Sequence, residues 1–374
     1  MDVFINDIQK FMPNAPVNNE EMEDYLGLIG GKKSRARKIV LKNNGIKQRY
    51  YVLEKGTEKP LFSNADITAK AIKKLPIDLT AIDCLSCGTT TPDQLMPNHA
   101  LMTQGELKIS EIETLSAAGI CLSGVNALKH AYLSVKSGEH QSAVATGSEV
   151  VSVILSAKNF EKESDTRGLE TDGSLAFEKD FLRWMLSDGA GAMLLQPTPN
   201  KEKLSLKIEW IDVLSYAGEM PVCMYSGCEV SENETRGWRS FSQDEVMQKS
   251  LLAIQQNVKL LNEHIIDYTV TKPMKRIIKK RQLQADAIDY FVPHYSSEYF
   301  RKKVYDGLIA ADFEIPYDKW FTNLSRYGNT GAASIYIMLE ELLHSNTLKR
   351  GDNLLCYIPE SGRFSTAFMM LKAV

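Results

Sequence analysis

Residues 81–88 read Ala-Ile-Asp-Cys-Leu-Ser-Cys-Gly, and residues 287–294 read Ala-Ile-Asp-Tyr-Phe-Val-Pro-His. Each stretch begins with the same three residues and enters a short apolar run that is typical of a buried strand. Each then ends in small, polar or proline residues. The spacing beyond these stretches is also similar, because Cys121 follows Gly88 by 33 positions and Asn329 follows His294 by 35 positions. This pattern predicts a duplicated chain.

The segments after Cys121 and Asn329 support the duplication. A helical pattern begins at each of these residues, and the first runs to about Ser137. A glycine turn and an apolar, strand-like run then follow in both halves, at residues 142–148 and 353–359. The repeated order of strand, loop, helix, turn and strand predicts two α/β halves related by a pseudo-twofold axis.

We place the boundary between the halves at residue 199, so that residues 1–199 carry the cysteine and residues 200–374 carry the histidine and asparagine. Ligands of open α/β sheets bind at the carboxyl ends of the strands. Cys121, His294 and Asn329 all follow such strand ends. The duplication therefore predicts that the three side chains meet near the interface of the halves.

Cys121 lies in Ser-Ala-Ala-Gly-Ile-Cys-Leu-Ser-Gly-Val-Asn, residues 116–126. Unpaired N–H groups and the helix dipole at a helix N-terminus favour a thiolate, which attacks carbonyl carbon. Acyl transfer also needs donors for the developing oxyanion. We expect these from the N–H of Cys121 and from Gly362. The competing interpretation of Cys121 alone is a buried thiol that acts as a small hydrophobe.

His294 and Asn329 are both hydrogen-bond donors. Together they can hold the thioester oxygen of a second substrate as it becomes an enolate, which then attacks the acyl-cysteine and forms a carbon–carbon bond. The competing interpretations are a structural histidine and a helix N-cap, a role that asparagine fills well.

Six segments carry a set of motifs in chain order: Asn44–Arg49, Thr89–Asp93, Ser116–Gly124, Ser187–Ala192, Val292–His294 and Arg326–Ile335. Together they resemble the β-ketoacyl-acyl-carrier-protein synthase III family of condensing enzymes. The resemblance implies a thiolase-like duplicated αβαβα five-layered fold and a homodimer. It also implies Cys121 as acyl acceptor with His294 and Asn329 as partners, thioesters of acyl carrier protein or coenzyme A as substrates, and no cofactor.

Two departures from this family bear on the reaction. Tyr-Ser-Ser follows His294 where the family has Gln-Ala-Asn, and Glu360-Ser-Gly-Arg replaces a Gly-Gly-Gly turn. The chain is most similar to the ketosynthases that form dialkylresorcinol and cyclohexanedione precursors. This likeness implies condensation of two fatty-acyl-derived thioesters, one of them 3-oxoacyl, with ring closure. Condensation without decarboxylation needs an additional base, for which Glu298 and Glu360 are candidates. The alternative is a conventional synthase III that uses malonyl carrier protein.

Composition limits the cellular setting. The 374 residues carry a net charge of −3, which provides no general attraction for nucleic acid. No apolar run approaches the ~18 residues of a membrane helix, and the N-terminus lacks a signal peptide pattern. The six cysteines are therefore expected to be reduced thiols in a cytoplasmic protein.

Further patterns give weaker expectations. Cys84 and Cys87 have the spacing of a redox or metal motif, which is an alternative function of another class. Lys279, Lys280 and Arg281 lie in a basic run that could steer an acidic carrier protein. We also expect a loop over the site or at a subunit contact at 155–180 and one long amphipathic helix over 243–263.

Overall fold

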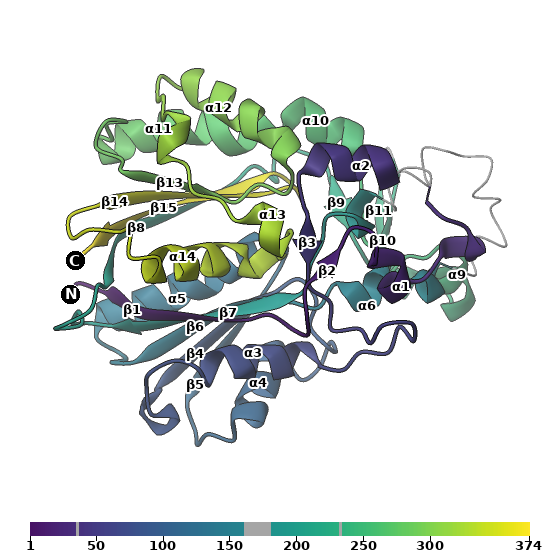
Figure 1. Cartoon of the computed structure of the whole chain (residues 1–374), viewed down its shortest axis with the longest axis horizontal. Helices are drawn as coiled ribbons and strands as arrows, with labels where there is room; N and C mark the ends of the chain where they lie inside the picture. Colours follow the sequence, from purple (N-terminus) through teal and green to yellow (C-terminus); the bar gives the residue numbers. More distant parts are fainter. Residues whose placement is uncertain (35–36, 161–180, 232–233) are drawn as a thin grey trace.

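The computed structural model describes residues 1–34, 37–160, 181–231 and 234–374. Its centre is a pair of helices, α5 (Leu122–Ser137) and α14 (Ser334–His344), which lie between two portions of a large sheet (Figure 1). These are the two helices that the sequence predicts after Cys121 and Asn329. The expected end of α5 near Ser137 is confirmed.

Nine strands form one mixed sheet in the order β13-β14-β15-β8-β1-β7-β6-β4-β5. The strands are β1 Phe4–Phe11, β4 Cys84–Thr89, β5 Glu113–Ala118, β6 Ala143–Glu149, β7 Gly189–Gln196, β8 Leu206–Ser215, β13 Tyr290–Pro293, β14 Asn353–Glu360 and β15 Ser365–Ala373. Among the described residues, strand pairing joins the two portions only between β1 and β8, where Phe4 and Ile5 pair with Lys207 and Leu206.

Strand pairing repeats between the portions. In the first, β4 and β6 are parallel, and β7 and β1 add antiparallel neighbours. In the second, β13 and β14 are parallel, and β15 and β8 add antiparallel neighbours. The parallel partner of β4 is β5, and the matching place beside β13 holds an isolated parallel bridge between Phe291 and Trp320. The predicted duplication is thus visible in the topology, while the boundary at residue 199 stays a prediction.

Of the four hydrophobic clusters among the described residues, three hold the layers together. The central core contains α5, α14 and the inner faces of both sheet portions. A second core lies under α3 (Asn64–Ile72) and α4 (His99–Leu107), and a third lies under α11 (Lys272–Arg281) and α12 (Arg301–Ile309). Helix, sheet, helix, sheet and helix layers follow one another, as Figure 1 shows. Five consecutive residues of α14, from 335 to 339, are buried, because a helix between two sheets has no solvent face.

The remaining elements of the described chain are short helices and strands outside the large sheet and its covering helices. The helices are α1 Met22–Leu26, α2 Arg37–Asn44, α6 Ser152–Leu155, α9 Gln243–Gln248, α10 Val258–Ile266 and α13 Leu324–Tyr327; the strands are β2 Val17–Asn18, β3 Gln48–Arg49, β9 Met224–Tyr225, β10 Cys228–Val230, β11 Thr235–Gly237 and β12 Gln255–Gln256. Among the described residues, no helix has the length and apolarity needed to cross a membrane.

The prediction of a single helix over 243–263 is wrong. The chain leaves the helix after Gln248, Ser250 adopts a positive φ of 46°, and β12 then pairs with β9 before α10 begins. The apolar period of this segment reflects burial of two short helices and a strand rather than one continuous face. Of the loop expected over 155–180, residues 161–180 lie outside the described residues.

The turn before α14 fits closely against α5 and β6. A Cβ on Gly147 would lie 2.2 Å from the carbonyl oxygen of Ala332, and one on Gly124 would lie 2.3 Å from the same atom. The Tyr336 hydroxyl donates to the Gly124 carbonyl over 2.8 Å. Only glycine at 124 and 147 therefore permits this contact between the halves.

Replacing Gly147 with Ala should lower the free energy of unfolding by about 1–3 kcal/mol, because overpacking displaces the Ala332 backbone. Urea unfolding measures this change. Gly105→Ala is the matched control: it lies in α4 with no atom within 4 Å of the added Cβ, and alanine is the better helix former. Equal stability of the two variants would contradict the packing constraint.

Candidate functional site

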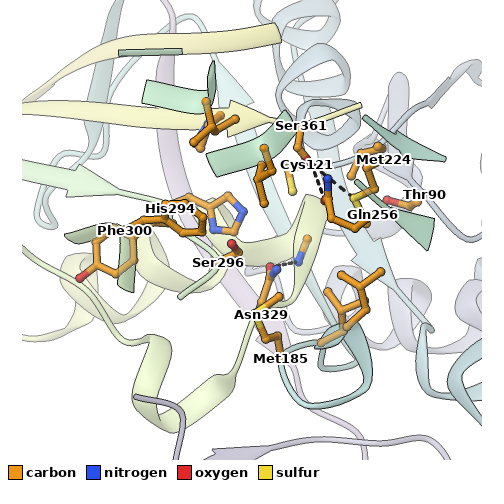
Figure 2. A pocket seen from close by; sticks show the side chains of 18 of the residues that line it. Thr90, Cys121, Met185, Met224, Gln256, His294, Ser296, Phe300, Asn329 and Ser361 are labelled. Atoms are coloured by element: carbon orange, nitrogen blue, oxygen red, sulfur yellow. Dashed lines mark hydrogen bonds between the residues drawn. The ribbon is translucent and has the colours of Figure 1, made fainter. Parts of the chain in front are cut away.

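A largely apolar pocket lies where the carboxyl ends of the central strands meet. It contains about 870 Å³ of space, part of which is open to solvent. Cys121, His294 and Asn329 all line it, and Figure 2 shows their side chains around one space. The structure therefore brings together the three residues that the sequence singled out, from the start of α5, the end of β13 and the turn before α14.

Cys121 is the N-cap residue of α5, and its side chain is partly accessible. Burial raises the pKa of its thiol, and the carboxylates of Glu360 and Glu149 raise it further. This differs from the sequence expectation of a stabilised thiolate. The helix N-terminus is present, but two acidic side chains from distant strands lie near it, and they favour the protonated thiol.

His294 is 4% exposed, and burial lowers its pKa to about 4. Its ring is therefore neutral at pH 7 and has one N–H to donate. The side-chain oxygen of Asn329 accepts a hydrogen bond from the N–H of Gly331 over 3.0 Å. This bond leaves the NH₂ group of Asn329 as its free donor. Both residues thus have the donor capacity that the enolate hypothesis requires.

Glu149, at the end of β6, is a pocket residue that the sequence reasoning missed. Its carboxylate accepts hydrogen bonds from the N–H and hydroxyl of Thr90, the hydroxyl of Thr91, and the N–H of Ala332. Burial raises its pKa to about 7. Glu149 thereby ties the Asn329 turn of the second half to β4 and β6 of the first. Its place at a strand end is a signal that could have found it.

The two expected oxyanion donors, Cys121 and Gly362, differ in their position relative to the pocket. Among the described residues, the N–H of Cys121 donates to no other residue, and its interaction with the thiol of Cys121 itself acts to lower the pKa of that thiol. Gly362 is not among the described residues that line the pocket, and its carbonyl accepts hydrogen bonds from the N–H groups of Cys223 and Met224. Its neighbour Ser361 lines the pocket and donates to the side chain of Gln256 (Figure 2).

The two candidate bases lie in different places. Glu298 lies 3.9 Å from Arg301 and accepts a hydrogen bond over 3.1 Å from the hydroxyl of Tyr295, which lines the pocket. Glu360 accepts hydrogen bonds from the N–H groups of Ile120 and Leu122, on either side of Cys121. Neither carboxylate is among the described residues that line the pocket, and of the two only Glu360 is held beside the cysteine.

Most of the pocket wall is apolar. The side chains come from the segment before β7, from β9 and β12, and from α10 and α12; they include Leu182, Met185, Leu186, Met224, Ile254, Leu261, Ile265, Phe300 and Val304. No Lys or Arg is among the described residues that line it. A wall of this kind suits an apolar chain with a polar group at one end.

Cys84 and Cys87 cannot form a redox or chelating pair. They lie three positions apart on β4, so their side chains face opposite sides of the sheet and belong to different cores. Burial raises their pKa values to about 11 and about 12. Cys84, Glu113 and His140 place donor atoms within 4.8 Å of one another. They supply three ligands, one of them a protonated thiol, whereas structural zinc sites use four.

The basic residues at the end of α11 are partly neutralised. Lys280 and Arg281 both contact the carboxylate of Asp212, at 2.7 and 2.8 Å. Lys279 is exposed. None of the three lines the described part of the pocket. In contrast, α2 packs beside the turn Glu298–Phe300, and Phe300 does line the pocket.

Comparison with known proteins gives a consistent result. The family described as "3-Oxoacyl-[acyl-carrier-protein (ACP)] synthase III C terminal" matches residues 278–362. A β-ketoacyl-[acyl-carrier-protein] synthase III of Clostridium perfringens is 25% identical over 345 residues, which are 92% of this chain and 91% of the relative. One from Streptococcus agalactiae is 26% identical over 352 residues, covering 93% and 92%.

Solved structures agree on the fold. The tetronic acid condensing enzyme AbyA1 has a TM-score of 0.77 at 17% identity, with 99% of both chains covered. OleA of Xanthomonas campestris, solved with lauric acid and lauroyl-CoA, has a TM-score of 0.75 at 17% identity, covering 100% of this chain and 99% of OleA. These similarities confirm the thiolase-like fold that the sequence predicts.

Glu149→Gln should change how stability depends on pH. The raised pKa of about 7, against an ordinary value of 4.5, means that ionisation of Glu149 in the folded protein becomes costly as pH rises from 4.5 to 7. Relative to the variant, the free energy of unfolding of the wild type should fall by up to about 3 kcal/mol between pH 4.5 and 7. It should fall no further above pH 7. Urea unfolding between pH 5 and 8 measures the difference. A difference that does not vary with pH would contradict the assignment.

Proposed function

We propose that the chain is a synthase III-like condensing enzyme of the thiolase superfamily, and that it joins two fatty-acyl-derived thioesters by Claisen condensation through an acyl group on Cys121. The observation that carries this proposal is the meeting of Cys121, His294 and Asn329 in one apolar pocket. A thioester acyl group is an apolar chain with a polar end, and it matches the composition of the pocket wall.

The cycle begins with loading. The Cys121 sulfur attacks the thioester carbon of the first substrate, and the carrier thiol leaves with the proton. A second thioester then enters, and its carbonyl oxygen accepts hydrogen bonds from the neutral His294 ring and the Asn329 NH₂ group. These donors stabilise the enolate. The enolate forms when the α-carbon loses either a proton to a carboxylate base or carbon dioxide. The enolate carbon bonds to the acyl carbon and the carbon–sulfur bond to Cys121 breaks. The sulfur then takes a proton, from that base in the first case or from water in the second.

The finer proposal concerns the second substrate. We propose a 3-oxoacyl thioester, condensation without loss of carbon dioxide, and ring closure to a dialkylresorcinol or cyclohexanedione precursor. Its support is Glu360 beside Cys121, where the resembled family has a glycine turn. Conventional synthase III chemistry with malonyl carrier protein is the second candidate, favoured by the names of the curated relatives. Release of carbon dioxide in a reconstituted assay distinguishes the two.

The setting of the enzyme is part of the same proposal. None of the six cysteines forms a disulfide bond, which fits a reducing cytoplasm. We propose a homodimer that works without a cofactor and takes its acyl groups from acyl carrier protein or coenzyme A.

Intact-protein mass spectrometry after incubation with a panel of acyl thioesters tests the covalent step. A stable acyl adduct should form on the wild type and on Cys228→Ala, and it should be lost in Cys121→Ala. Cys228 is the matched control, because its thiol is also partly accessible but lies in β10. Absence of any wild-type adduct across the panel would overturn the proposal.

Asn329→Asp tests the enolate donor. The aspartate keeps an oxygen for the Gly331 N–H and replaces only the donating NH₂ group. Adduct formation at Cys121 should persist, while the rate of carbon–carbon bond formation should fall by about 10²–10³, the effect of losing one oxyanion donor. Single-turnover assays with preloaded enzyme measure this step. Equal loss of loading and condensation would point to a folding defect instead.

Docking of a carrier protein gives a separate comparison. Lys279→Glu and the pair Lys38→Glu with Lys42→Glu change exposed charge on α11 and on α2. The pair should raise the apparent KM for carrier-bound substrate roughly threefold to tenfold, because α2 is nearer the pocket, and leave the KM for coenzyme A thioesters unchanged. If only Lys279→Glu raised the apparent KM for carrier-bound substrate, the result would place docking on α11 instead. Lys280 and Arg281 stay unaltered, because carboxylates there would face Asp212.

A further inference from the structure

Glu360 accepts hydrogen bonds from the backbone N–H groups on either side of Cys121. One oxygen of its carboxylate, Oε2, accepts hydrogen bonds from the N–H of Ile120 over 3.3 Å and from the N–H of Leu122 over 3.1 Å. These N–H groups flank Cys121 at the start of α5. The carboxylate is therefore held by the polypeptide that carries the reacting sulfur, and not by a salt bridge among the described residues.

The second oxygen of Glu360 is available. Within the described residues, Oε1 accepts no hydrogen bond. Glu149, the other carboxylate near Cys121, has both oxygens engaged by Thr90, Thr91 and Ala332. Glu298 accepts a hydrogen bond from the hydroxyl of Tyr295, which lines the pocket, and no described hydrogen bond links Glu298 to the residues around Cys121. Among these three carboxylates, only Glu360 combines proximity to Cys121 with a free acceptor oxygen.

The position of Glu360 changes what the helix N-terminus does. The N–H groups of Ile120 and Leu122 and the dipole of α5 would otherwise favour a thiolate at Cys121. They interact instead with the Glu360 carboxylate. Burial, Glu360 and Glu149 keep the Cys121 thiol protonated, and burial also raises the pKa of Glu360 itself. A protonated thiol is a weak nucleophile. Loading therefore requires a group that accepts its proton as the sulfur attacks.

We propose that Glu360 is this proton acceptor. The inference rests on the proposed function and adds a residue to it. During loading, the Cys121 S–H proton moves to Oε1 of Glu360 while the sulfur bonds to the thioester carbon. The carbon–sulfur bond of the carrier then breaks, and the departing carrier thiolate takes the proton from Glu360. The carboxylate is thus restored, and no other reactant is needed.

Other titratable groups face the same sulfur. Glu149 approaches from the end of β6 and His294 from the end of β13, and both line the pocket. Any pH profile of loading contains their contributions. For this reason the informative quantity is the change between the wild type and a Glu360 variant, with Glu149→Gln measured beside them.

The experiment measures the rate of acyl adduct formation at Cys121 with one acyl-coenzyme A, by quenched intact-protein mass spectrometry from pH 5.5 to 9.5. Glu360→Gln keeps an oxygen for the N–H groups of Ile120 and Leu122 but cannot accept a proton. At pH 7 its loading rate should fall by about 10²-fold or more, the usual effect of losing a general base. The remaining rate should rise steeply toward alkaline pH, as the thiol ionises without help.

The opposite result has an equally clear meaning. If Glu360 acts only as a negative charge, its removal lowers the thiol pKa, so loading at pH 7 becomes faster. A faster or unchanged rate would overturn the proposal. Glu298→Gln, the same substitution in a carboxylate away from Cys121, should load at the wild-type rate.

Folding and the proposed function are checked separately. Glu360→Gln should still reach a full adduct at long times, whereas Cys121→Ala should never do so. If thermal unfolding shows that Glu360→Gln is destabilised, Glu360→Asp gives a second measurement: it keeps a carboxylate and should recover loading at neutral pH. Failure of the aspartate to exceed the glutamine rate would also overturn the proposal. Absence of a wild-type adduct would instead overturn the proposed function.

Discussion

The carbonyl of Ala332 lies directly against Gly124 of α5 and Gly147 of β6, and the rest of the site depends on this contact. A side chain at either glycine would meet the carbonyl oxygen at less than 2.5 Å. The contact brings the turn that carries Asn329 across to the helix that begins at Cys121. Glu149 reinforces it by accepting the Ala332 N–H over 3.0 Å. Two halves that are far apart in sequence thereby share one pocket.

Burial then sets the chemistry of that pocket. Removal from water keeps the Cys121 thiol protonated and the His294 ring neutral, and it raises the pKa of Glu149 to about 7. A neutral imidazole is a suitable donor for an enolate oxygen, because it does not hold a full positive charge in an apolar cavity. The same burial makes the cysteine a poor nucleophile by itself. In the proposed reaction, a pocket that suits condensation thus leaves the loading of Cys121 in need of a proton acceptor.

Much of this arrangement could be predicted from the sequence. The repeated Ala-Ile-Asp strands and their spacing predicted the duplicated fold and the meeting of Cys121, His294 and Asn329. Periodicity failed over 243–263, because short buried segments on either side of β12 mimic one amphipathic helix. Because of that error, the sequence did not identify Gln256 as a pocket residue, although its side chain accepts a hydrogen bond from Ser361 there. The strand pattern could have excluded the pair Cys84 and Cys87, because their spacing of three places them on opposite faces of the sheet, in different cores.

The sequence by itself identified Cys121, His294 and Asn329 as candidates and predicted the order of the elements that present them, because strand and helix periods and the strand-end rule are local properties of the chain. Tertiary structure alone decided their charge states and their neighbours. Glu360 reaches Leu122 across 238 positions, and Glu149 reaches Ala332 across 183. Electrostatic coupling depends on distance in space and on exclusion of water, and neither can be read from residues so far apart along the chain. For this reason the helix N-terminus that predicted a thiolate belongs, in the folded protein, to a protonated thiol beside a carboxylate.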